Sequence, residues 1–181
     1  KFMANYFFAP QEYPDIPMRR DATNDTYLFE QAPTRGLGKI CFHDWEKTFN
    51  KFDSLNISIF RSQVLILRSM LEEAGPEGSQ ARDIDFLLAL GELFSLVVYA
   101  QLILENVELM GISEEVTEQM FDVFVRDFSA YATRLHGISG ATERQAEFAL
   151  AMVKRPNADA ERFNAVWEEV SGLMDTYELA P

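Results

Sequence analysis

DIDFLLALGELFSLVVYAQLILENVELMG, from Asp83 to Gly111, is a long apolar run that contains no proline. Glu92, Gln101 and Glu105 lie within it. Because a helix that is apolar on every side must be covered on every side, this run predicts the central helix of an all-α protein, over about 84–110. The rest of the chain is expected to pack around this helix.

Further helices are predicted by apolar residues at helical spacing and by residues that cap helix ends. The expected helices span about 44–52, 58–74, 113–136 and 142–155, and Asp44 is expected to cap the first of them. A last helix is expected from about residue 159. Its apolar residues are Phe163, Val166, Trp167, Val170 and Met174. Thr142 and Gln145 have the spacing of a capping box. We therefore expect an up-down helical bundle over residues 43–181, with short connections.

Residues 1–42 differ from the rest of the chain because they are rich in aromatic residues and proline. Prolines break long helices, so this segment predicts an irregular arm, with at most a short helix over 21–31. Its aromatic side chains, among them Phe2, Tyr6, Phe7, Phe8 and Tyr13, need a partner surface.

The charge balance excludes several classes of partner. The chain carries 16 Lys and Arg against 29 Asp and Glu, a net charge of −13. Such a protein is repelled by nucleic acids and by anionic membranes.

The expected location is the cytoplasm. The single cysteine, Cys41, predicts a buried, inert thiol in a reducing compartment, and no secretory signal pattern is seen. Residues 86–104 have the length of a membrane span, but Glu92 in their middle argues against one.

Glu92 is the most informative polar residue, since a buried carboxylate can serve as a base or a ligand. The alternative is that it lies at an edge or pairs with Arg126 or Arg134, and this structural role is the one we expect. Gln101 and Glu105 have the spacing of a pair on one helix face.

No residue is assigned a catalytic, cofactor-binding or metal-binding role. His43 and His136 are the two histidines, and neither follows a glutamate at the Glu-x-x-His spacing of di-metal bundles. His43 is expected next to a helix cap, and His136 at a helix C-terminus. The segment 34–39 resembles a phosphate-binding loop but lacks its first glycine and its Ser/Thr, which indicates an ordinary turn.

Two groups of short segments resemble one protein family. The first group is Tyr6–Phe8, Glu12–Pro14, Arg19–Ala22, Arg35–Ile40 and Phe42–Trp45; the second is Leu90–Phe94, Val97–Glu105, Phe121–Val123 and Val125–Ser129. Together they resemble the C-terminal helical extension of large bacterial acyl-CoA dehydrogenase-like flavoproteins, and more loosely the last helical domain of acyl-CoA oxidases.

The resemblance implies part of an enzyme of fatty acyl-CoA oxidation, whose FAD and acyl-CoA sites lie in other domains. The catalytic glutamate of that family maps onto no glutamate of this chain. We therefore expect a domain that is not catalytic alone and holds no FAD, and that serves assembly or shapes the acyl site. The expected partners are the catalytic domains of the same enzyme or another subunit, in a homo-oligomer.

Two other functions fit the same residues. One is a stand-alone helical interaction module, with an apolar arm and an acidic surface that bind a basic or hydrophobic partner. The other is an enzyme or lipid binder with a pocket between the helices near Glu92 and Tyr99.

Overall fold

The computed structural model describes residues 2–11 and 42–177, and within these ranges the chain forms helices and no strands. The predicted all-α class is confirmed. The chain divides into two compact units between Lys47 and Thr48, each of which is described by itself. The predictions for the short helix at 21–31, the turn at 34–39, Tyr13 and Cys41 lie outside the described residues.

The first unit contains a helix where an irregular arm was expected, since α1 spans Phe2–Phe8. Tyr6 lies edge-to-face against Phe42 with ring centroids 5.2 Å apart, and Phe7 lies edge-to-face against Trp45 at 5.8 Å. Four aromatic rings thus lie together, and such contacts add stability beyond the area that they bury. The prediction of irregular structure is wrong for this part because α1 ends before Pro10, and proline restricts only the residues next to it.

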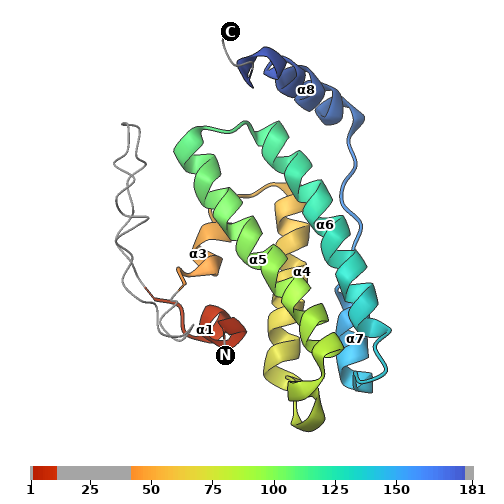
Figure 1. Ribbon diagram of the computed structural model, residues 1–181. Helices are drawn as coiled ribbons and strands as arrows, with labels where there is room; N and C mark the ends of the chain where they lie inside the picture. Colours follow the sequence, from red (N-terminus) through yellow and green to blue (C-terminus); the bar gives the residue numbers. More distant parts are fainter. Residues whose placement is uncertain (1, 12–41, 178–181) are drawn as a thin grey trace. The chain divides into compact units, whose positions relative to one another are not determined.

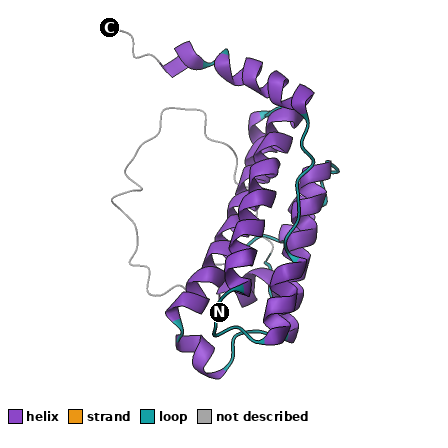
Figure 2. Cartoon of the chain, turned by 90° about the vertical axis from the view of Figure 1, so that its right-hand side faces the viewer, coloured by secondary structure: helices purple, strands orange, loops and turns teal. Residues whose placement is uncertain are grey.

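The second unit is an up-down bundle (Figure 1). Its elements are the end of α3 (Trp45–Phe49), α4 (Leu55–Glu73), the 3-10 helix η2 (Gly78–Arg82), α5 (Ile84–Met110), α6 (Glu114–His136), α7 (Glu143–Ala151), α8 (Ala160–Ser171) and the 3-10 helix η3 (Met174–Tyr177). Helices α4 to α7 alternate in direction, and α8 lies beyond the end of the bundle where α5 turns into α6 (Figures 1 and 2).

Local capping fixes the ends of the longest helix. The Asp83 carboxylate accepts hydrogen bonds from the backbone N–H groups of Asp85 and Phe86 at 3.1 and 3.2 Å. Gly111 ends α5 in the left-handed conformation, with φ of 66°, which costs glycine little. The predicted helix over 84–110 is therefore confirmed.

Phe60 of α4 lies at the centre of the core and is fully buried. Its ring centroid is 5.4 to 6.0 Å from those of four other phenylalanines: Phe49, Phe121, Phe124 and Phe128. Three of these four belong to α6, so this cluster joins α4 to α6. Helix α6 also packs against α5, α7 and α8.

Two helix boundaries differ from the predicted ones. Helix α4 begins at Leu55 rather than Ser58, because the distant carboxylate of Glu118 accepts hydrogen bonds from the Asn56 N–H at 3.0 and 3.3 Å. Helix α7 ends at Ala151 instead of continuing to Pro156. Residues 152–157 are non-helical because side chains of α4 and α6 hold their backbone.

Gln63 is one of the side chains that hold this segment. Its buried amide donates to the backbone oxygens of Met152 at 2.8 Å and Val125 at 3.3 Å, and to Ser129 Oγ at 3.0 Å. Gln63→Leu should lower the free energy of unfolding by about 1–3 kcal/mol, because these buried acceptors lose their donor. Urea denaturation measures the change, and a midpoint equal to that of the unaltered chain would contradict this role.

Candidate functional site

The Glu92 carboxylate forms an ion pair with Arg134, whose Nη1 lies 2.7 Å from Oε1 and 2.8 Å from Oε2. One of the two expected pairings is thus confirmed, and Arg126 pairs with Asp122 instead. The Glu92 side chain is also a third exposed. A carboxylate that is both paired and hydrated has the features of a structural residue rather than of a buried base.

Other polar residues of α5 are also engaged in tertiary contacts. Gln101 Nε2 donates to Glu105 Oε1 at 3.0 Å, as the spacing predicted, and Thr48 Oγ1 donates to the same oxygen at 3.3 Å. Lys51 Nζ lies 2.7 Å from Glu108 Oε2. These contacts hold the segment around residues 48–51 against α5.

Each of the two histidines lies near the end of a helix. His136 ends α6, and its Nδ1 lies 3.0 Å from the Ala146 backbone oxygen. His43 lies before α3, where the neighbouring Asp44 accepts a hydrogen bond from the Glu46 N–H at 2.9 Å, as expected of a cap. Within residues 2–11 and 42–177, no three His, Cys, Asp or Glu side chains are grouped as metal ligands.

Arg144 connects α7 to α4. Its guanidinium lies 2.7 Å from Glu73 and 2.9 Å from Glu147, and it stacks over the Phe148 ring at 4.3 Å. The hydrogen bonds to Glu73 and then Glu147 raise the pKa of Arg144 above its ordinary value. The group is solvent-exposed and already charged at neutral pH, so this raised pKa indicates a structural tie and no proton-transfer role.

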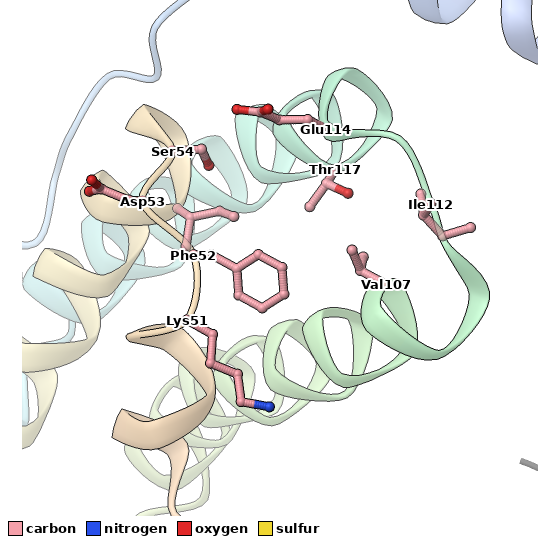
Figure 3. Close-up of a pocket in the computed structure, with 9 residues that line it drawn as sticks. Lys51, Phe52, Asp53, Ser54, Val107, Ile112, Glu114 and Thr117 are labelled. Carbon is pink, nitrogen blue, oxygen red and sulfur yellow. The ribbon is translucent and has the colours of Figure 1, made fainter. Parts of the chain in front are cut away.

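A pocket of about 360 Å³ opens between the 51–54 loop, the end of α5 and the start of α6 (Figure 3). Its lining is Lys51, Phe52, Asp53, Ser54, Ile57, Val107, Ile112, Glu114 and Thr117. The lining contains no histidine and no cysteine, and Lys51 is paired with Glu108. An apolar floor with a charged rim suits an apolar side chain of a partner.

A second, shallower hollow of about 470 Å³ lies where α8 meets the start of α6. Five of its seven lining residues are acidic, and the lining is Glu114, Glu115, Glu118, Asp159, Glu161, Arg162 and Ala165. The one cation, Arg162, is held by the protein itself, since Nη2 donates to the Asn157 backbone oxygen at 2.7 Å. This hollow therefore creates a negative field beside α8. Neither pocket is lined by Glu92 or Tyr99.

One side of α5 is uncovered, although coverage on every side was expected. Its residues recur at intervals of three, four and seven, and we call them the α5 stripe: Ile84, Leu88, Ser95, Tyr99, Leu102, Asn106 and Leu109. Ile84 is 71% exposed and Leu88 54%. The expectation is wrong for the described part of the chain because α5 packs mainly on α6, and its buried residues, among them Phe86, Leu93 and Val97, lie on another side of the helix.

The α5 stripe carries no charged residue, and its polar members bond within their own helix. Ser95 Oγ donates to the Gly91 backbone oxygen at 2.8 Å, and Asn106 Nδ2 donates to that of Leu102 at 2.7 Å. The Ser95 hydroxyl and one N–H of the Asn106 amide are therefore satisfied without water, which lowers the cost of burying this face.

Helix α8 is amphipathic, but its apolar side points away from the bundle. Its uncovered residues, which we call the α8 face, are Phe163, Trp167, Val170 and, in η3, Met174. Trp167 is 66% exposed and Met174 74%. The opposite side contains Glu161, Ala165 and Glu169, and these residues line the acidic hollow or bond α6.

The sequence identified the apolar positions of both helices but not which of them are exposed. In α5 the sequence did contain an indication of an exposed apolar side, because the helix is apolar all round and one neighbouring helix can cover only part of its surface. In α8, a regular amphipathic pattern gave no indication that the polar side faces the bundle.

Among the described helices, α5 is the one long and apolar enough to cross a membrane, with a mean hydropathy of 2.0 in its most apolar window. The core helix of a soluble protein meets the same criterion, and 39% of this window is buried in the protein. That no helix spans a membrane stays a prediction.

Comparison of the chain with models of known protein families, with curated proteins and with solved structures gives no match.

Proposed function

We propose that this chain is a non-catalytic helical assembly domain that docks on a partner protein through the α5 stripe. The observation that carries the proposal is an uncharged, exposed apolar row that extends from Ile84 to Leu109 along one helix. Contiguous apolar patches on soluble proteins mark interaction surfaces.

The middle of the α5 stripe suits the close approach of a second helix. Gly91 and Ser95 lie one turn apart, and a Cβ atom added at Gly91 would meet no atom within 4 Å. Small side chains shorten the distance between packed helices and increase their contact. Tyr99 adds an aromatic anchor of the kind that dominates interface energies, and its ring is oriented by Phe124 at 5.4 Å.

The polar groups support a binding role rather than a catalytic one. Glu92 is paired with Arg134, and the 360 Å³ pocket has no histidine or cysteine in its lining to activate a nucleophile. That pocket is lined by Val107 and Ile112, close to Leu109 in the chain. It would accept one apolar side chain of a partner that covers the stripe.

The resemblance to acyl-CoA dehydrogenase-like flavoproteins suggests which partner this is. On that basis the partner consists of FAD-containing catalytic domains, in the same polypeptide or in another cytoplasmic subunit, and the assembly is a homo-oligomer. FAD and the acyl-CoA substrate would bind there, and this domain would position or shape that enzyme.

The double variant Leu88→Asp with Leu102→Asp should abolish assembly, because two carboxylates buried in an apolar interface cost several kcal/mol each. To measure assembly, the tagged chain is expressed in its source cells and purified. The amount of any protein that co-purifies with it in a stoichiometric ratio is then quantified, and the flavin absorbance of that protein is recorded. Leu150→Asp on α7, at another exposed leucine, is the matched control and should assemble as the unaltered chain does.

The outcomes separate the two parts of the proposal. A flavin-containing partner that is lost only in the double variant supports both parts. A partner without flavin supports the assembly role and contradicts the flavoenzyme identification. A chain that is monomeric and has no stoichiometric partner contradicts the assembly role, and acyl-CoA oxidation by the free chain with added FAD contradicts the non-catalytic claim.

A further inference from the structure

Helix α8 packs with its polar side inward, the reverse of an ordinary surface helix. None of its residues is buried, and Phe163, Trp167 and Val170 follow one another at spacings of four and three on the outward side. An amphipathic helix gains stability in water by burying its apolar side. The outward orientation therefore needs a cause within the protein and leaves a surface that a partner can cover.

Specific polar contacts cause this orientation. The Asp159 carboxylate caps α8 by accepting from the N–H groups of Glu161 and Arg162 at 2.9 and 3.1 Å. The Arg162 side chain is only 10% exposed and lies 3.5 Å from Glu118 of α6. At the other end of the helix, Ser113 Oγ donates to Glu169 Oε2 at 2.8 Å. Contacts at both ends fix which side of α8 faces the bundle.

The charges of α8 and of its surroundings are almost all negative. Glu161, Glu168 and Glu169 belong to α8, and the acidic hollow on its inner side adds Glu114 and Glu115. The only basic residue of α8 is Arg162, which the contacts above already use. In the described residues, no basic side chain forms an ion pair with Glu161 or Glu168.

We propose that the α8 face binds a basic amphipathic helix of a partner protein. Leucine-like side chains of that helix would cover Phe163, Trp167 and Val170, and its lysines or arginines would meet the exposed Glu168 beside them. Helix recognition by apolar anchors at such spacing, with charges that select the partner, is a common mode of binding. A second copy of this chain carries the same negative charge, and an anionic bilayer is also negative, so charge disfavours both as occupants.

This binding does not depend on the α5 stripe, so either surface can be tested alone. The probe is a fluorescent synthetic peptide with leucines on one side of a helix and lysines on the other. Its binding to the full chain is measured by fluorescence anisotropy at low and high salt. The control peptide keeps the leucines and has glutamates in place of the lysines.

Trp167→Ala should weaken binding of the Leu/Lys peptide on the order of thirtyfold, the loss typical of a central tryptophan at an interface. Glu168→Lys should weaken binding of the Leu/Lys peptide and strengthen binding of the Leu/Glu control peptide, because it replaces a negative charge beside the α8 face with a positive one. Because α8 buries no residue, these variants should retain the unfolding temperature of the unaltered chain. Leu150→Ala and the α5 double variant should bind as tightly as the unaltered chain.

Four results would overturn the proposal. Equal binding of both peptides would remove the charge selectivity, and unchanged binding by Trp167→Ala would place the peptide elsewhere. A dimer in sedimentation that Trp167→Ala abolishes would identify a second copy as the occupant. Binding to phosphatidylcholine vesicles that depends on Trp167, with none to the Leu/Lys peptide, would identify a lipid surface.

Discussion

Phe60→Ala is expected to lower the free energy of unfolding by about 3–5 kcal/mol, the largest loss predicted for one side chain of this protein. Phe60 is fully buried, and its ring contacts Phe49 and three phenylalanines of α6. The substitution would remove both the transfer free energy of the ring and the edge-to-face contacts, and the fixed helices around it would leave a cavity.

Urea denaturation followed by circular dichroism measures this change. Leu150→Ala, at a leucine of α7 that is 60% exposed, is the control and should change stability by about 0.5 kcal/mol or less. If Phe60→Ala unfolded at the same urea concentration as Leu150→Ala, the aromatic cluster would not be the centre of the core.

Glu118→Ala is expected to lower the free energy of unfolding by about 2–4 kcal/mol, because one carboxylate serves two groups with little access to water. It accepts hydrogen bonds from the Asn56 N–H at the start of α4, and it lies 3.5 Å from the Arg162 guanidinium, whose side chain is 10% exposed. Its removal would leave a helix-terminal donor without an acceptor and would weaken the ion pair that orients α8.

Glu118→Gln separates these two roles, since the amide oxygen still accepts from Asn56 but carries no charge. We expect Glu118→Gln to be less stable than the unaltered chain and more stable than Glu118→Ala. We also expect proteases to cleave its α8 more readily than that of the unaltered chain. A Glu118→Ala protein as stable as the unaltered chain would show that the cap of α4 is supplied in another way.

The sequence was sufficient for those helices whose ends are fixed by neighbouring residues. Asp83 and Gly111 delimit α5, Ser113 caps α6, and Thr142 with Gln145 forms the capping box of α7. In each case the capping group lies within a few residues of the backbone group to which it bonds. The helix end can therefore be predicted from a short stretch of sequence.

The sequence was insufficient where a distant side chain decides the structure. Glu118 lies 62 residues from Asn56, and Gln63 lies 89 residues from Met152. Because of such contacts, α4 begins about one turn before the predicted residue, and α7 ends at Ala151, several residues before Pro156. The same limit applies to both candidate surfaces, since a list of apolar residues does not specify which of them another helix covers.

The pairing of Glu92 shows how much of a candidate site is predictable. The sequence suggested a carboxylate on an apolar helix and two possible arginine partners, because an uncompensated charge is costly there. It did not distinguish Arg134 from Arg126, since that choice depends on how α5 and α6 pack. In the structure Arg126 pairs with Asp122 within α6, and Arg134 is the one that reaches Glu92.

Oxidative footprinting of the chain in its native assembly tests the central claim most directly. In the purified chain, Tyr99 and Leu109 of the α5 stripe should be oxidised readily, as should the exposed Leu150 of α7. In the native assembly we predict strong protection of Tyr99 and Leu109 and none of Leu150. Equal oxidation of Tyr99 and Leu109 in both samples would mean that the α5 stripe faces water in the cell, and it would contradict the assembly role.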